Sequence, residues 1–211
     1  MTAALVEPRA GDPGSIAVGS NAIEARTIAA TLACIARHGL SKTTIDDIAR
    51  EAGCSRATLY RYFGTKVDLV SRVVSAEAER VTAVCRDAAA DATTLDDAVY
   101  TVLLVAGREL ADHPALRFVA DFEPEILLPH LTFSGGDRFL ADASRALAPC
   151  FEPFLGERAP RGAEWVARLG LALWLSPTAP VSLHDAEGLR AYVHEFITPA
   201  LHTVPVLTKE E

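Results

Sequence analysis

Residues 43–66, TTIDDIAREAGCSRATLYRYFGTK, have the spacing of two short helices joined by a tight turn. Thr43, followed three residues later by Asp46, is a helix-start signal, because the hydroxyl accepts from a free backbone N–H and the carboxylate lies near the positive end of the helix dipole. Gly53 stands where the first helix would end with a residue at positive φ. Ser55 then predicts the N-cap of the second helix.

Apolar side chains give both predicted helices a buried face, because they recur at intervals of three and four residues. The residues expected on these faces are Ile45, Ile48, Ala49 and Ala52 in the first helix, and Leu59, Tyr62 and Phe63 in the second. The small residues Ala49 and Gly53 suit a close crossing of the two helices. A second helix placed in this way can lie in the major groove of DNA. The alternative is an ordinary corner between two helices of a helical protein.

Together with a helix predicted before it, this segment resembles the N-terminal DNA-binding domain of the TetR family of bacterial transcriptional regulators. The resemblance covers about residues 23–74 and rests on the phrases TTIDDIAREAG, SRATLYRYF and TKVDLV. Three positions depart from the family pattern: Cys54 replaces a usual aliphatic residue, Ala57 a frequent Gly, and Arg61 a frequent His. The resemblance implies a homodimer that reads a palindromic operator and responds to a small-molecule effector.

Polar side chains of this segment are the candidates for contacts with double-stranded DNA. Arg56 and Thr58 are assigned to base edges, because Arg is the usual bidentate partner of guanine and the Thr methyl group can meet thymine. Lys66 sits where family members place a phosphate contact, although an exposed Lys could equally be a solvated surface charge. The other residues assigned to DNA are Thr43, Thr44, Ser55, Tyr60 and Arg61.

The distribution of charge is compatible with DNA binding although the whole chain, of 211 residues, has a net charge of −8. Residues 21–80 carry nine Lys and Arg against seven Asp and Glu, whereas residues 81–211 carry ten against nineteen. The basic side is therefore local, and the acidic remainder should limit non-specific adhesion to DNA.

Four cysteines, Cys34, Cys54, Cys85 and Cys150, lie far apart without the spacing of a zinc site. The sequence shows no secretory signal and no apolar run of membrane-spanning length. We therefore expect a cytoplasmic protein with free thiols, no membrane partner, no metal and no cofactor. A redox sensor is the alternative interpretation of the thiols, and buried structural cysteines are the commoner one.

The chain is expected to be all-α, with an N-terminal three-helix helix-turn-helix domain followed by a helical-bundle ligand-binding and dimerisation domain. Residues 1–20 are expected to be a disordered tail, residues 21–66 the DNA-binding domain, and residues 67–211 the second domain. Asn21 and Glu24 predict a capping pair at the start of the first helix, which Gly39 ends. Thr65 and Asp68 begin a fourth helix that links the two domains.

The remainder of the chain shows helical periodicity and no strand alternation. The helices expected there are residues 94–113, 114–123, 137–148, 161–177 and 185–201. The connection between the third and fourth of these helices is expected at Pro149, Pro153, Gly156 and Pro160.

Two sets of apolar residues are candidate contact surfaces. A dimer through the last two helices is expected to use Trp165, Leu169, Leu173, Leu189, Tyr192 and Phe196. A mostly apolar ligand is expected to contact Leu103, Leu104, Phe118, Phe122, Phe133, Leu171 and Trp174. His113, Arg117, His130 and Arg138 are candidate polar selectors. Each set could instead be ordinary core or surface.

The function expected from these patterns is that of a DNA-binding transcriptional regulator, a repressor that an apolar ligand releases from its operator. One alternative is a DNA-binding dimer without a small-molecule inducer. Another is a helical-bundle enzyme, with Glu109 and His113, or His184 and Asp185, as catalytic pairs. The enzyme is disfavoured because the sequence lacks any catalytic motif and any carboxylate and His set repeated on separate helices.

Overall fold

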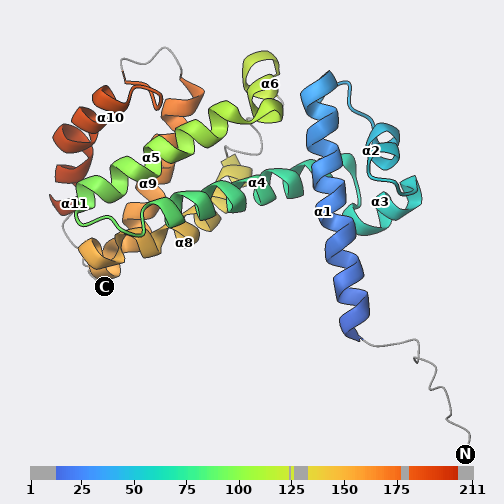
Figure 1. The fold of residues 1–211 in the computed structure, drawn as a ribbon, viewed down its shortest axis with the longest axis horizontal. Coiled ribbons are helices and arrows are strands. Elements are labelled where there is room, and N and C mark those ends of the chain that lie inside the picture. Colours follow the sequence, from blue (N-terminus) through green and yellow to red (C-terminus); the bar gives the residue numbers. More distant parts are fainter. Residues whose placement is uncertain (1–12, 124, 126–132, 177–180, 204–211) are drawn as a thin grey trace, which may run out of the picture.

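The computed structural model describes residues 13–123, 125, 133–176 and 181–203, and the regular elements in these ranges are all helical. In chain order they are α1 (Pro13–His38), α2 (Ile45–Glu51), α3 (Arg56–Phe63), α4 (Lys66–Ala88), α5 (Leu95–Asp112), α6 (Pro114–Phe122), α8 (Phe133–Leu155), a 3₁₀ turn (Gly156–Arg158), α9 (Ala159–Leu175), α10 (Ala186–Tyr192), a π-helical turn (Val193–Ile197) and α11 (Thr198–Thr203). Figure 1 shows α1 to α3 as a small head and the later helices as a larger body, with α4 running between them. The all-α prediction is confirmed.

A small apolar core holds the head together. Its buried residues come from α1 to α4 and are Ala30, Cys34, Ile48, Ala49, Ala52, Leu59, Leu69 and Val73. Gly53 ends the α2 segment at a φ of 62°, a conformation that a residue with a Cβ adopts only with strain. A Cβ at Gly53 would meet nothing within 4 Å. The small residue at the helix crossing is therefore Ala49, and Gly53 is needed for its backbone conformation instead.

A second cluster joins the head to the body. Its buried residues are Ile35 of α1, Leu40 of the following turn, Val70 of α4, and Ala115 and Val119 of α6. Through it α6 packs against α1, next to α4 (Figure 1). The body core is larger and is built around fully buried side chains such as Phe151, Leu103 and Val166.

The first helix starts earlier than predicted. α1 begins at Pro13, so residues 13–20 of the predicted tail are helical, and residues 1–12 lie outside the described residues. Proline suits the first turn of a helix, because its fixed φ is helical and its missing N–H would have no partner there. Asn21 and Glu24 are consequently inside α1, and Glu24 pairs with Arg72 of α4 instead of capping a helix start.

The connections in the body also differ from the prediction. Pro149 and Pro153 lie inside α8, which continues although each removes one backbone donor, because neighbouring residues such as Phe151 are buried in the body core. The chain turns at Gly156, and Pro160 lies in the first turn of α9. The predicted last helix is divided by the π-helical turn, which precedes Pro199.

Candidate DNA-binding and ligand-binding sites

The start of α2 is one residue later than the sequence analysis places it. Thr44, not Thr43, is the N-cap, and it forms a capping box with Asp47. Thr43 is buried, and its hydroxyl donates to the carbonyl of Gly39 at 2.6 Å. A phosphate contact by the Thr43 side chain does not fit this burial, whereas the exposed Thr44 remains free to face DNA.

The outward face of α3 carries most of the predicted DNA contacts. Ser55 caps this helix by accepting from the backbone N–H of Thr58 at 3.1 Å. Tyr60, Arg61 and Arg56 are exposed, as predicted. Tyr62 was expected in the core but is 39% exposed, and the Arg61 guanidinium lies 5.2 Å from its ring centroid. The face is therefore more aromatic than the sequence pattern indicates.

Arg56 forms an ion pair with a residue of α2. Its Nε lies 3.0 Å from the Asp46 carboxylate of α2, and both side chains are more than half exposed. An ion pair so exposed contributes little stability, because water screens it. It does, however, occupy Nε and leaves the two terminal nitrogens of the guanidinium for a base edge.

Lys66 lies in the first turn of α4, but its ammonium group is directed to the protein. Nζ donates to the carbonyl of Leu40 at 2.9 Å and is half-buried. The predicted phosphate contact would require Lys66 to leave this partner. In the described state it ties the start of α4 to the turn after α1.

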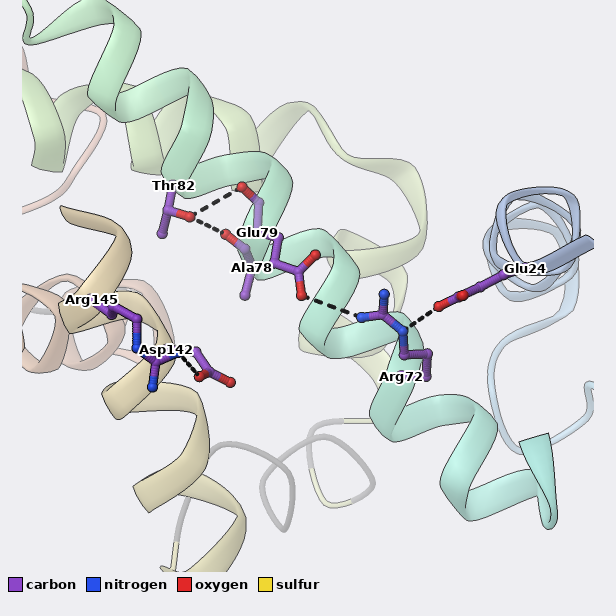
Figure 2. A network of polar contacts seen from close by, with 7 residues as sticks. All are labelled: Glu24, Arg72, Ala78, Glu79, Thr82, Asp142 and Arg145. Carbon is purple, nitrogen blue, oxygen red and sulfur yellow. Dashed lines mark hydrogen bonds and ion pairs between the residues drawn. The ribbon is translucent and has the colours of Figure 1, made fainter. Parts of the chain in front are cut away.

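The same turn is bound from the other side by Glu123, the C-cap of α6. The Glu123 carboxylate accepts from the backbone N–H groups of Leu40 and Ser41, at 2.5 and 3.3 Å, and from the Ser41 hydroxyl. Burial favours the neutral acid, but these hydrogen bonds prevail and keep the pKa of Glu123 below its usual value. Figure 2 shows a further link, in which Arg72 of α4 joins Glu24 of α1 to Glu79.

The body contains a cavity of about 120 Å³ between α4, α5, α6, α8 and α9. Of the predicted ligand contacts, Leu103, Leu171 and Trp174 line it. Leu104 packs in the body core instead, and Phe118 and Phe122 contact each other on α6, where Phe122 is 71% exposed. The side chain of Phe133 lies outside the described residues. The sequence analysis missed Val74, Ala78, Val81 and Thr82 of α4, whose helical stripe gave no sign that it faces a cavity.

Glu77 is the one ionisable carboxylate of the cavity lining in the described structure. Its Oε2 lies 2.8 Å from Nε of Arg80 and 3.3 Å from Nε2 of His113. Contact with His113 is the main cause that lowers the pKa of Glu77, against the opposing effect of burial. Arg80 in turn pairs with Glu109 at 2.5 Å. The predicted catalytic pair of Glu109 and His113 is thus divided between two partners of α4.

The candidate dimer residues divide into two groups. Trp165, Leu169, Leu173 and Tyr192 are half-buried, and Phe196 is 56% exposed beside the Tyr192 ring. Leu189 is fully buried in the body core, so it cannot contact a partner, contrary to the prediction.

The thiols give no support to redox chemistry. Cys34, Cys85 and Cys150 are buried, and Cys54 is partly buried. Burial is the main cause that raises the pKa of Cys85 to about 12, which keeps it a thiol rather than the reactive thiolate.

Within the described ranges, no group of three or more His, Cys, Asp or Glu is placed to hold a metal ion. No helix among the described residues has the length and apolarity to cross a bilayer.

Known proteins share this arrangement. The family model described as bacterial regulatory proteins of the TetR family matches residues 28–73. An uncharacterised helix-turn-helix-type transcriptional regulator of Mycobacterium tuberculosis is 29% identical over 163 residues, which are 74% of this chain and 73% of that protein. The TetR family repressor AlkX of a Dietzia species, implicated in biodegradation of n-alkanes, is 22% identical with a TM-score of 0.68, over 86% of this chain and 96% of that one. FadR of Bacillus subtilis, solved with stearoyl-CoA, is 15% identical with a TM-score of 0.58, over 80% and 96%.

The head and these similarities define a helix-turn-helix DNA-binding regulator. Residues 28–73 match the TetR family of bacterial regulatory proteins, as the sequence predicts, and the fold of the chain resembles that of the TetR family repressor AlkX. The matched family model and the similar protein of Mycobacterium tuberculosis are both described as regulators, which favours a regulator over the enzyme alternative.

Proposed function

We propose that the chain is a repressor that dimerises, binds a palindromic operator in double-stranded DNA and leaves it when a small, largely apolar ligand fills the cavity. In this proposal residues 21–66 are the DNA-binding domain and residues 67–211 the ligand-binding and dimerisation domain. The protein would act in the cytoplasm, where bacterial DNA lies. The observation that carries the proposal is that α4 and α6 both line the cavity and both hold the head.

The route from cavity to head is short. Leu116 of α6 lines the cavity, and the same helix ends at Glu123, which binds Leu40 and Ser41 of the head. A ligand that displaces α6 or α4 would change the angle of the head. It can do so only if it binds one arrangement more tightly than the other, and a few kcal/mol of difference is enough.

The half-buried apolar residues of α9 and Tyr192, together with the exposed Phe196, support a dimer. Trp165, Leu169, Leu173, Tyr192 and Phe196 would pack against their copies around a two-fold axis. Such a dimer would place two α3 helices about 34 Å apart, which matches successive major-groove faces. Arg56 and Thr58 would then contact bases, and Thr44, Ser55, Tyr60 and Arg61 would contact phosphates.

The similar structures support a ligand-responsive repressor. AlkX is a repressor implicated in n-alkane degradation, and the Bacillus subtilis FadR structure contains an acyl-CoA. The cavity of this chain is lined almost entirely by apolar side chains, which suits an apolar ligand.

Reciprocity of binding tests the proposal. A compound that raises the thermal stability of the protein should weaken its binding to the operator, measured by fluorescence anisotropy, and the operator should weaken compound binding by the same factor. A compound that binds in the cavity and leaves operator affinity unchanged would separate the cavity from regulation. A protein that responds to no compound class would instead be the regulator without an inducer.

A further inference from the structure

The polar groups of the cavity are almost all engaged with the protein itself. The Thr82 hydroxyl donates to the carbonyls of Ala78 and Glu79 on its own helix, at 2.8 and 3.1 Å (Figure 2). The Cys85 thiol lies 3.5 Å from the carbonyl of Val102, to which it donates. A ligand therefore finds no free donor on these two side chains.

Glu77 is different, because only one of its two carboxylate oxygens has a partner. Arg80 and His113 both contact Oε2, and no donor among the described residues contacts Oε1. The side chain is 10% exposed, and among the described residues only the Thr198 hydroxyl is a buried side-chain oxygen without a partner, so solvent still reaches Oε1 of Glu77. A ligand donor that replaces this water would form its hydrogen bond at the edge of a mostly apolar cavity.

The charge around this oxygen is negative. Nδ1 of His113 accepts from the backbone N–H of Leu116 at 3.2 Å, so that nitrogen carries no proton, and Nε2 carries the proton of a neutral ring. Of the remaining groups, Glu77 and Glu109 are acidic and Arg80 is basic, which leaves one negative charge. An anionic ligand group placed at Glu77 would be repelled.

We propose that the effector is a compact apolar molecule with a single hydrogen-bond donor and no negative charge, an amine or an alcohol, whose donor binds Oε1 of Glu77. This inference rests on the proposed function of the cavity and specifies its ligand. A cavity of about 120 Å³ is close to the size that accommodates one aromatic ring. An acyl-CoA, with its long chain and anionic phosphates, does not match this site.

Four probes of equal ring size test the chemistry: benzylamine, benzyl alcohol, toluene and benzoate. Each is titrated against the full-length protein without DNA, and the rise of the melting temperature is measured. We expect benzylamine to bind about tenfold more tightly than toluene, because it adds a charge-assisted hydrogen bond to the same apolar contact. Benzyl alcohol should fall between these two, and benzoate should produce no rise.

Two variants assign the effect to the carboxylate. Glu77→Gln keeps the size of the side chain and removes its charge, so it should abolish the preference for benzylamine over benzyl alcohol. Glu79→Gln is the matched control, because Glu79 lies on the same helix and does not line the cavity, and it should leave the order of the probes unchanged.

The outcomes separate this inference from the proposed function. If toluene or benzoate binds as tightly as benzylamine, the donor specificity is wrong although the cavity still binds ligands. If the preference persists in Glu77→Gln, the donor binds elsewhere and the inference is overturned. If none of the four probes raises the melting temperature, the inference is overturned, whereas the ligand-binding role of the cavity fails only if no compound class raises it.

Discussion

The carboxylate of Glu123 accepts a hydrogen bond from the backbone N–H of Leu40 at 2.5 Å, across 83 residues of sequence. Glu123 ends α6 in the body, and Leu40 lies in the turn that connects α1 to α2 in the head. Lys66 of α4 donates to the carbonyl of the same residue, Leu40. The head is thus held by α4 and α6, two of the helices that line the cavity.

Removal of the Glu123 carboxylate should loosen the head. We expect Glu123→Ala to lower the free energy of unfolding by about 1–3 kcal/mol, because it leaves the buried Leu40 N–H without its acceptor. Amide hydrogen exchange at Leu40 and Ser41 should become faster. Asp121→Ala, an exposed change on the same helix, is the control. Equal stability and equal exchange in the two variants would show that the contact does not hold the head.

The same contact should make stability depend on pH. The pKa of Glu123 is lowered in the folded state, so its contribution is complete above the unfolded pKa of about 4.3 and is lost as pH falls through the lower folded pKa. Denaturant unfolding of wild type and Glu123→Gln should therefore differ most near neutral pH and converge in acid. A difference that grows as pH falls below 4 would contradict the assigned direction.

The two arginines of α3 should have different roles. Arg56→Ala should relax sequence preference, with a loss of about 1–3 kcal/mol of discrimination at the base pair that Arg56 contacts. Arg61→Ala should weaken binding to all sequences and reduce its salt dependence, because it removes a phosphate contact. Competition binding with operator and mutated duplexes measures both. The division between base and phosphate contacts is wrong if the two variants lose preference equally.

Substitutions at Phe196, which is exposed, and at Leu189, which is buried, should have different effects on the dimer and on the stability of the protomer. Phe196→Glu should dissociate the dimer and leave each protomer folded, because Phe196 is exposed on the protomer. Leu189→Ala should instead destabilise the protomer by about 2–5 kcal/mol, because it opens a cavity in a filled core. Sedimentation velocity and thermal unfolding distinguish these effects. A Phe196→Glu protein that stays dimeric would place the interface elsewhere.

The head could be predicted from sequence because its signals are local. Gly39, Gly53, Ser55 and the Thr65–Asp68 capping box act within one helix turn, and each occurs where the pattern places it. The shift of the α2 start from Thr43 to Thr44 was not predictable in this way. Two threonines are adjacent there, and only the burial of Thr43 beside Gly39 decides between them.

The body was less predictable because its contacts are long-range. Helical periodicity identified a buried face on each helix, but it did not show which faces leave a cavity and which fill a core. Leu103 and Leu104 are neighbours in sequence, and only Leu103 lines the cavity. Glu77 of α4 also gave no signal as a ligand-binding residue, because its partner His113 lies far along the chain, between α5 and α6.

Selection of bound sequences from random duplex DNA, repeated at two salt concentrations, tests the central claim most directly. The account predicts enrichment of a palindrome whose half-sites are centred about one helical turn apart, with affinity that falls steeply as salt rises. This result would establish the base contacts of α3 and the two-fold dimer together. Enrichment of no sequence by the ligand-free protein at either salt concentration would contradict the claim that the head of this chain reads an operator.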